Sequence, residues 1–229
     1  MDSKLRTPNS ELRTLVEKKI SLDEVLIKIQ AHSLSKILFW GEEVGEISSY
    51  TAGWMASQGI DVIVLDGANR FNPYTISSFA KKSLISPENL LKRIRIARAF
   101  TCYQMVTLIE EKLISLIRHE RGLTRPQKIW VILLGPVTPF LDEDVPEREI
   151  RSLFERSLIR LEGMAVEGIP CFLFQPSIPS DAKRASLTKR LFNFSNLVWR
   201  IHVDEQGTKM VPEKRLGHLD IGAQNLFGI

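Results

Sequence analysis

Residues 36–48 have the sequence KILFWGEEVGEIS, in which a short apolar run ends at a glycine and leads into a stretch with helical character. The run KILFW at 36–40 predicts a buried strand. The residues after Gly41 predict a helix that extends to about Gln58. A strand that turns directly into a helix is the opening of a βαβ unit, so this stretch places the chain in the α/β class.

The same alternation of strand and helix continues along the chain. Further strands are predicted at 61–66 (DVIVLD), 91–97 (LKRIRIA), 128–134 (KIWVILL) and 170–174 (PCFLF), and helices from about Tyr74, over 101–119 and over 146–166. Residues 196–203 and 208–211, separated by DEQG, predict a C-terminal β-hairpin. We therefore expect a three-layer α/β/α domain with a mostly parallel sheet, because apolar strands between helices need cover on both faces.

The pattern divides the chain into three parts. Residues 1–35 are predicted to be an N-terminal helical extension, because apolar residues in 10–31 recur near helical spacing. Residues 36–215 form the predicted core domain. Residues 216–229 form a tail whose apolar side chains either pack on the domain or anchor a partner. These side chains are Leu219, Ile221, Leu226, Phe227 and Ile229.

Composition limits the class of protein. Hydrophobic residues make up 44% of the chain, and no stretch of 18 apolar residues or signal-peptide pattern is present, so we expect no membrane association. Two isolated cysteines, Cys102 and Cys171, favour a reducing compartment and hence a cytoplasmic location. The net charge of +4 and the pI near 9.1 fit a nucleic-acid partner, although many soluble proteins share them.

The turn after the first strand occupies the place of a phosphate-binding loop. Against the pattern G-x-x-x-x-G-K-[ST], Gly41 and Ser48 match, but Glu46 replaces the second glycine and Ile47 the lysine. The degenerate nucleotide-binding loop comprises Gly41, Gly45, Glu46, Ile47, Ser48 and Ser49. A carboxylate near a phosphate charge costs roughly 4 kcal/mol at an effective dielectric of 20. The loop is thus predicted to reject a triphosphate unless its acidic side chains point away, and an ordinary strand-to-helix turn is the alternative interpretation.

Four segments together resemble the core of the RecA/RadA recombinase family over residues 36–203. They are VLDGANRFNP at 64–73, LKRIRIARAFTCYQ at 91–104, KIWVILLGPVTPF at 128–140 and GIPCFLFQ at 168–175. Their order and spacing carry the resemblance, which implies a RecA-like fold.

The resemblance also implies that the ATPase machinery has been lost. The phosphate-gripping lysine falls on Ile47, the glutamate that polarises the attacking water on Ala68, and the Walker B aspartate on Gly135. Only Ser48 and Gln175 keep a family-like residue. We therefore expect no catalytic residue, no bound metal and no ATP or magnesium as cofactor, because phosphoryl transfer depends almost wholly on positioning and electrostatics.

Two polar residues remain as a possible residual site. Asp66 ends the second strand, where a carboxylate either binds a metal or, as we favour, caps the following turn. Gln175 ends the strand that precedes the family's second DNA-binding loop.

A basic stretch follows Gln175 directly. In SDAKRASLTKR at 180–190, the possible nucleic-acid contacts are Lys183, Arg184, Lys189 and Arg190. Cations there would contact phosphates and release counterions. The alternative is a solvated helix face with Leu187 and Leu191 packed inward.

The sequence supports three hypotheses. The first is a non-catalytic RecA-like accessory protein of DNA recombination or repair that binds DNA, a RecA-fold partner or copies of itself. The second is a protein-only assembly scaffold of RecA fold. The third is an ATP-binding protein with an atypical loop, whose missing groups come from a partner.

Overall fold

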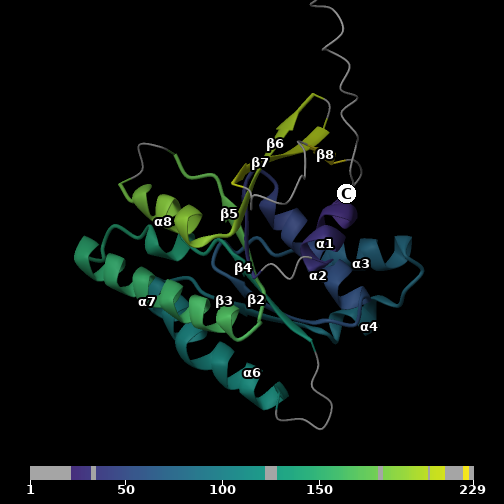
Figure 1. The fold of residues 1–229 in the computed structure, drawn as a ribbon, viewed down its shortest axis with the longest axis horizontal. Helices are drawn as coiled ribbons and strands as arrows, with labels where there is room; N and C mark the ends of the chain where they lie inside the picture. The colour runs from purple at the N-terminus through teal and green to yellow at the C-terminus, as the bar shows by residue number, and fades with distance from the viewer. Residues whose placement is uncertain are drawn as a thin grey trace, which may run out of the picture.

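The computed structural model describes residues 22–31, 35–121, 128–179, 183–205, 207–214 and 224–226. One eight-stranded sheet has the strand order β3-β2-β4-β5-β1-β6-β7-β8 (Figure 1). The pairs from β3 through β6 are parallel, and β6, β7 and β8 pair antiparallel. The strands are β1 (Lys36–Gly41), β2 (Asp61–Asp66), β3 (Ile94–Arg98), β4 (Ile129–Leu134), β5 (Cys171–Pro176), β6 (Leu197–Asp204), β7 (Gly207–Lys214) and β8 (Gln224–Leu226).

Helices cover both faces of the sheet and give the predicted three layers. On one face lie α1 (Leu22–Ala31), α2 (Val44–Ser57), α3 (Pro73–Lys82) and α4 (Pro87–Leu91). On the other lie α5 (Cys102–Thr107), the π-helical turn η1 (Leu108–Lys112), α6 (Leu113–Arg121), the short η2 (Thr138–Phe140), α7 (Glu147–Val166) and α8 (Ser186–Phe194). Figure 1 separates α1–α4 from α6–α8 across the sheet. The α/β/α class with a C-terminal hairpin is confirmed.

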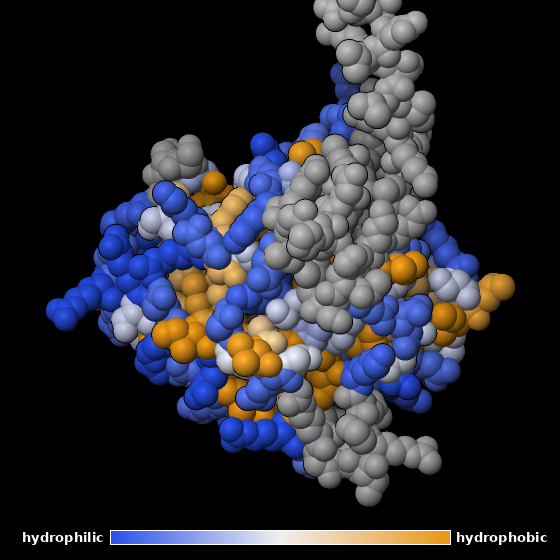
Figure 2. Space-filling view, in the orientation of Figure 1, coloured by the Kyte–Doolittle hydropathy of each residue, from blue (hydrophilic) through white to orange (hydrophobic). Residues whose placement is uncertain are grey.

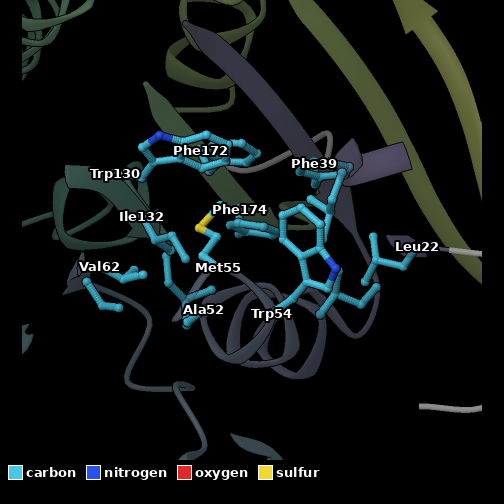
Figure 3. Packing of buried hydrophobic residues seen from close by; sticks show 14 of the residues in the cluster. Leu22, Phe39, Ala52, Trp54, Met55, Val62, Trp130, Ile132, Phe172 and Phe174 are labelled. Atoms are coloured by element: carbon cyan, nitrogen blue, oxygen red, sulfur yellow. The ribbon is translucent and has the colours of Figure 1, made fainter. Parts of the chain in front are cut away.

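The core consists of two apolar layers, one on each face of the sheet. All six residues of β2 and of β4 are buried, as expected for strands covered on both sides. In the layer beneath α2, Trp130 stacks on Phe172 and Phe39 on Phe174, with centroids 5.1 and 5.0 Å apart (Figure 3). The helix α1 adds Leu22, Leu26 and Ile29 to this same layer.

Two predicted boundaries differ from the structure. The third strand begins at Ile94, because Ser86–Pro87 starts the short helix α4, whose Leu90 is buried. The short strand β8 within 216–229 lies against β7 and was not predicted. The rest of the tail and residues 1–21 lie outside the described residues, and so do the predictions made for them.

The surface of the described part is mixed in character. Its helices include none with the length and apolarity needed to cross a membrane. On the face shown in Figure 2, apolar patches gather over the lower left, where Figure 1 draws α6 and α7. Two apolar side chains of α7, Ile159 and Val166, are 66% and 80% exposed.

Candidate functional site

The carboxyl ends of the parallel strands bring the predicted site residues to one edge of the sheet. Gly41 is the register partner of Pro176, and Asp66 is the partner of both Arg98 and Leu134. Ligands of open α/β sheets bind at such an edge. The predicted site residues therefore lie where a ligand of such a sheet would bind; they are the loop at 41–49, Asp66, Gly135 and Gln175. Their local geometry determines whether they can bind one.

The loop after β1 is too short to form a phosphate cradle. β1 ends at Gly41 and α2 begins at Val44, so residues 44–48 already belong to the helix. The N–H of Ile47 donates to the Glu43 carbonyl at 3.1 Å, which commits it to the helix. In a working loop the backbone N–H groups between the two glycines face the phosphates. Here Gly41 has φ 128°, and a side chain on it would overlap the carbonyl of Ile201 on β6.

The residue at the lysine position points into the core. Ile47 is completely buried and belongs to the apolar layer that α2 forms with α1, α3 and α4. A side chain with this direction cannot reach a phosphate outside the loop. The position that the P-loop pattern assigns to lysine therefore holds an apolar side chain that points inward.

The acidic residues of the loop bind neighbouring elements. Glu42 accepts the N–H of Val203 at 2.8 Å, and Glu43 accepts the Thr208 hydroxyl at 2.8 Å. These contacts join the loop to the β6–β7 hairpin. Glu46 accepts the side-chain amide of Asn72 at 2.9 Å and also the hydroxyl of Thr75 in α3.

The two serines of the loop are likewise engaged in the fold. Ser48 and Ser49 are buried, and both hydroxyls donate to the Gly45 carbonyl at 2.8 Å. The Ser49 oxygen also accepts the N–H of Asn72 at 2.9 Å. Ser48 matches the family pattern in sequence, but its proton serves a helix-internal bond.

Gly135, the position to which the RecA/RadA resemblance assigns an aspartate, has no room for a side chain. Gly135 follows β4 with φ 66°, and a Cβ on it would lie 2.6 Å from the Cβ of Ala68. The same Cβ would lie 2.8 Å from the Thr138 hydroxyl. These contacts are shorter than carbon and oxygen atoms tolerate, so a residue larger than glycine at position 135 would require the segment around Ala68 to move.

Asp66 and Gln175 are both buried and both satisfied. Asp66 accepts the N–H groups of Arg70 and Phe71 at 3.2 and 3.0 Å, and its second oxygen lies 3.5 Å from Nε of Arg98. Gln175 accepts the Val137 N–H at 2.9 Å and donates to the carbonyl of Pro176 at 3.0 Å. Each side chain thus fastens the turn beside its strand, as the capping interpretation of Asp66 expects.

Arg184 does not fit the nucleic-acid contact predicted for it. The side chain is 2% exposed, and its guanidinium donates to the carbonyls of Phe140 and Val145, at 2.9 and 2.5 Å, and to that of Asp142. Its Nε lies 3.2 Å from Glu147. The reason is that Arg184, in the turn that precedes α8, faces the loop after η2, where its guanidinium satisfies three carbonyls.

Two of the remaining cations of the basic stretch are paired at the surface. Lys183 lies 3.5 Å from Glu143, and Arg190 pairs with Glu155 of α7. Lys189 is exposed and has no hydrogen bond or ion pair with any described residue. Leu187 and Leu191 are fully buried. The stretch thus has the helix face expected by the alternative interpretation, with Lys189 as its one cation that no described residue pairs.

Neither cysteine is arranged as a nucleophile. Burial raises the pKa of the Cys171 thiol to about 12, and burial also raises the pKa of the Cys102 thiol. Both stay protonated at neutral pH, and the thiolate is the reactive form. Within the described ranges, no group of three or more His, Cys, Asp or Glu side chains could hold a metal ion.

The comparisons with known proteins leave the family open. No protein-family model and no curated protein matches the chain. The resemblance to RecA/RadA proteins therefore remains a hypothesis that rests on the four segments and on the fold.

Proposed function

We propose that this protein is a non-catalytic, RecA-like accessory protein of DNA recombination or repair that acts by binding DNA, a protein partner or both. The observation that supports the absence of catalysis is the lack of room at Gly135, where even a Cβ would lie 2.6 Å from the Cβ of Ala68. The buried Ile47 and the short loop after β1 also support the absence of catalysis.

A nucleotide titration tests the loss of the ATP site. We expect magnesium and ATP to give no binding constant tighter than about 100 µM by isothermal titration calorimetry, a threshold of roughly −5.5 kcal/mol. The physical reason is that neither a cation nor an inward-facing backbone remains at the loop. Tighter binding would contradict the proposal and would favour an ATP-binding protein with an atypical loop.

A protein-binding surface lies at the β3 edge of the sheet. β3 is the last strand on its side, so one row of its backbone N–H and C=O groups faces outward with no described strand beside it. A hollow of about 210 Å³ opens beside the strand. Its apolar lining is Ile63, Leu65, Ile96, Ala97, Leu108, Leu113 and Leu116. An edge strand next to an apolar hollow is suited to an extended segment that adds a strand and inserts one side chain.

Charge favours a different protein over a second copy as the occupant. Arg95 and Arg98 lie on β3, and Lys112 lines the hollow. Two β3 strands paired edge to edge would bring these cations together, which is unfavourable. We therefore assign the β3 edge to an extended segment of another chain, with an apolar residue flanked by acidic ones.

The substitution Ile96→Glu tests this surface. Ile96 is 41% exposed, so we expect the variant to fold normally. A partner that co-purifies with the native protein is first isolated. It should then fail to bind the Ile96→Glu variant. Hydrogen exchange should show that partner binding slows exchange of the β3 amides. Leu84→Glu, at a residue 96% exposed between α3 and β3, is the matched control. A partner that binds both variants equally would place the interface elsewhere.

The second candidate function is a protein-only scaffold of RecA fold. The specific observation in its favour is that Lys183, Arg184 and Arg190 are all engaged by neighbouring groups. Direct DNA binding separates it from the first candidate.

A further inference from the structure

The exposed aromatic side chains of the described residues follow the carboxyl ends of the neighbouring strands β2 and β3, on α3 and on the segment that leads into α5. Tyr74, Phe100 and Tyr103 are 82%, 68% and 47% exposed, and every other Phe, Tyr or Trp in the described ranges is at least partly buried. Tyr74 lies in the first turn of α3, which follows β2, while Phe100 and Tyr103 follow β3. Exposed aromatic rings concentrated at one place are a feature of interaction sites.

The buried carboxylate of Asp66 holds this region together. It accepts the N–H of Arg70 at 3.2 Å and lies 3.5 Å from Nε of Arg98. The Asp66 carbonyl accepts the N–H of Ala99 at 3.1 Å, and Phe100 is the next residue. A single residue therefore fixes both arginine-bearing segments and the start of the segment that carries the exposed rings.

The rings project from backbone that is already fixed. The N–H of Phe100 donates to Oε1 of Gln104 at 2.8 Å. The N–H of Tyr74 donates to Oδ1 of Asn72, the N-cap of α3, at 3.0 Å. A ring on a rigid backbone loses little conformational freedom when it binds a ligand.

Two guanidinium groups accompany the rings. Arg70 is exposed, and its side chain has no hydrogen bond or ion pair with a described residue, while the Arg98 side chain is 45% exposed. Two carboxylates also lie in this region, and their hydrogen-bond donors are neutral groups that supply no positive charge. Glu46 accepts from Asn72 and Thr75, and the hydroxyl of Tyr103 donates to Glu149 at 2.8 Å.

We propose that this aromatic–arginine edge, formed by Arg70, Tyr74, Arg98, Phe100 and Tyr103, binds single-stranded nucleic acid. Bases stack on the rings, and phosphates contact Arg70, while Arg98, whose Nε lies 3.5 Å from Asp66, adds the exposed part of its side chain. A double helix hides the faces of its bases, so the exposed rings favour single strands. The inference rests on the proposed function, in which DNA is a partner, and moves the interface away from the α8 stretch to this edge.

Fluorescence anisotropy with labelled oligonucleotides tests the proposal on the full chain. The probes are a thymidine single strand, a duplex of the same length, and an abasic strand that keeps the phosphates but lacks bases. We expect the thymidine strand to bind best. Phe100→Ala and Tyr74→Ala should each weaken its binding roughly tenfold to hundredfold. Arg70→Ala should also lower the salt slope, by about 0.7 per lost phosphate contact.

Three further variants separate stacking from other contacts. Phe100→Leu keeps the apolar side chain but removes the ring, so binding should fall as in Phe100→Ala. Leu84→Ala changes an exposed apolar residue elsewhere, and Lys189→Ala removes an exposed cation of α8. Both should bind as the native protein does.

The outcomes distinguish this inference from the proposed function. If single strands bind but the ring substitutions have no effect, or the abasic strand binds equally, the aromatic–arginine edge is not the interface. DNA binding by the protein would then stand. If the native protein binds the duplex but no single strand, this inference falls and the DNA part of the proposed function stands. If it binds neither probe even at low salt, both fall. The β3 edge would then remain as a separate proposal for a protein partner.

Discussion

The substitution Ile47→Lys is expected to lower the free energy of unfolding by about 4 kcal/mol and to restore no ATP binding. Ile47 is completely buried among apolar residues, so the new ammonium group has no solvent and no counter-charge there. A lysine in such a place either loses its proton or opens the surrounding structure, at 1.36 kcal/mol for each unit by which its pKa falls. Urea unfolding followed by circular dichroism measures the loss.

Ile47→Met is the matched control, because it keeps the apolar character and nearly the volume. It should cost less than about 1.5 kcal/mol. The combined variant Ile47→Lys, Ala68→Glu, Gly135→Asp should be less stable still, since its new side chains would collide. A stable triple variant that binds magnesium and ATP would show that the loop and the surroundings of Gly135 relax easily.

The layered fold could be predicted because buried strands have a recognisable, continuously apolar sequence. DVIVLD and KIWVILL are apolar nearly throughout, and in β2 and β4 every residue is buried. A strand covered on both faces has no room for alternation, so its sequence indicates its position. The start of β3 was harder, because Leu91 fits a strand as well as the helix α4 that includes it.

The local geometry of the loop could not be predicted from the motif. Counting residues identifies Ile47 as the replacement for a lysine, but it does not show that α2 begins at Val44. The contact between Ala68 and Gly135 joins segments far apart in the chain. Both features depend on how closely the strand ends approach each other, and that distance is set by the whole sheet.

Whether a given charged side chain is buried or exposed was the feature least predictable from the sequence. Lys183 and Arg184 are neighbours in a basic run, yet one is 62% exposed and the other 2%. Helical spacing gave a clue, because Arg184 lies three residues before the buried Leu187 and so faces the same side. The aromatic–arginine edge left no comparable signal, since Tyr74 lies in α3 and Phe100 in the segment after β3.

The substitution Arg184→Met is expected to lower the free energy of unfolding by about 3–5 kcal/mol. It removes a buried guanidinium and leaves the carbonyls of Phe140, Asp142 and Val145 without their donor. Loss of one partner from a buried charged network costs this much because the remaining polar groups stay desolvated. Chemical denaturation with guanidinium chloride, at matched protein concentration, measures the shift.

Lys183→Met is the control on the adjacent residue. Its ammonium group is exposed and lies 3.5 Å from the exposed Glu143, so the change should stay within about 0.5 kcal/mol. Arg184→Lys should recover only part of the loss, because one ammonium group cannot bond three separate carbonyls as a guanidinium does. An Arg184→Met protein with native stability but weaker, less salt-dependent DNA binding would return this residue to the nucleic-acid interface. We expect the opposite, because a side chain that is 2% exposed and fastens the loop between η2 and α7 cannot reach a phosphate.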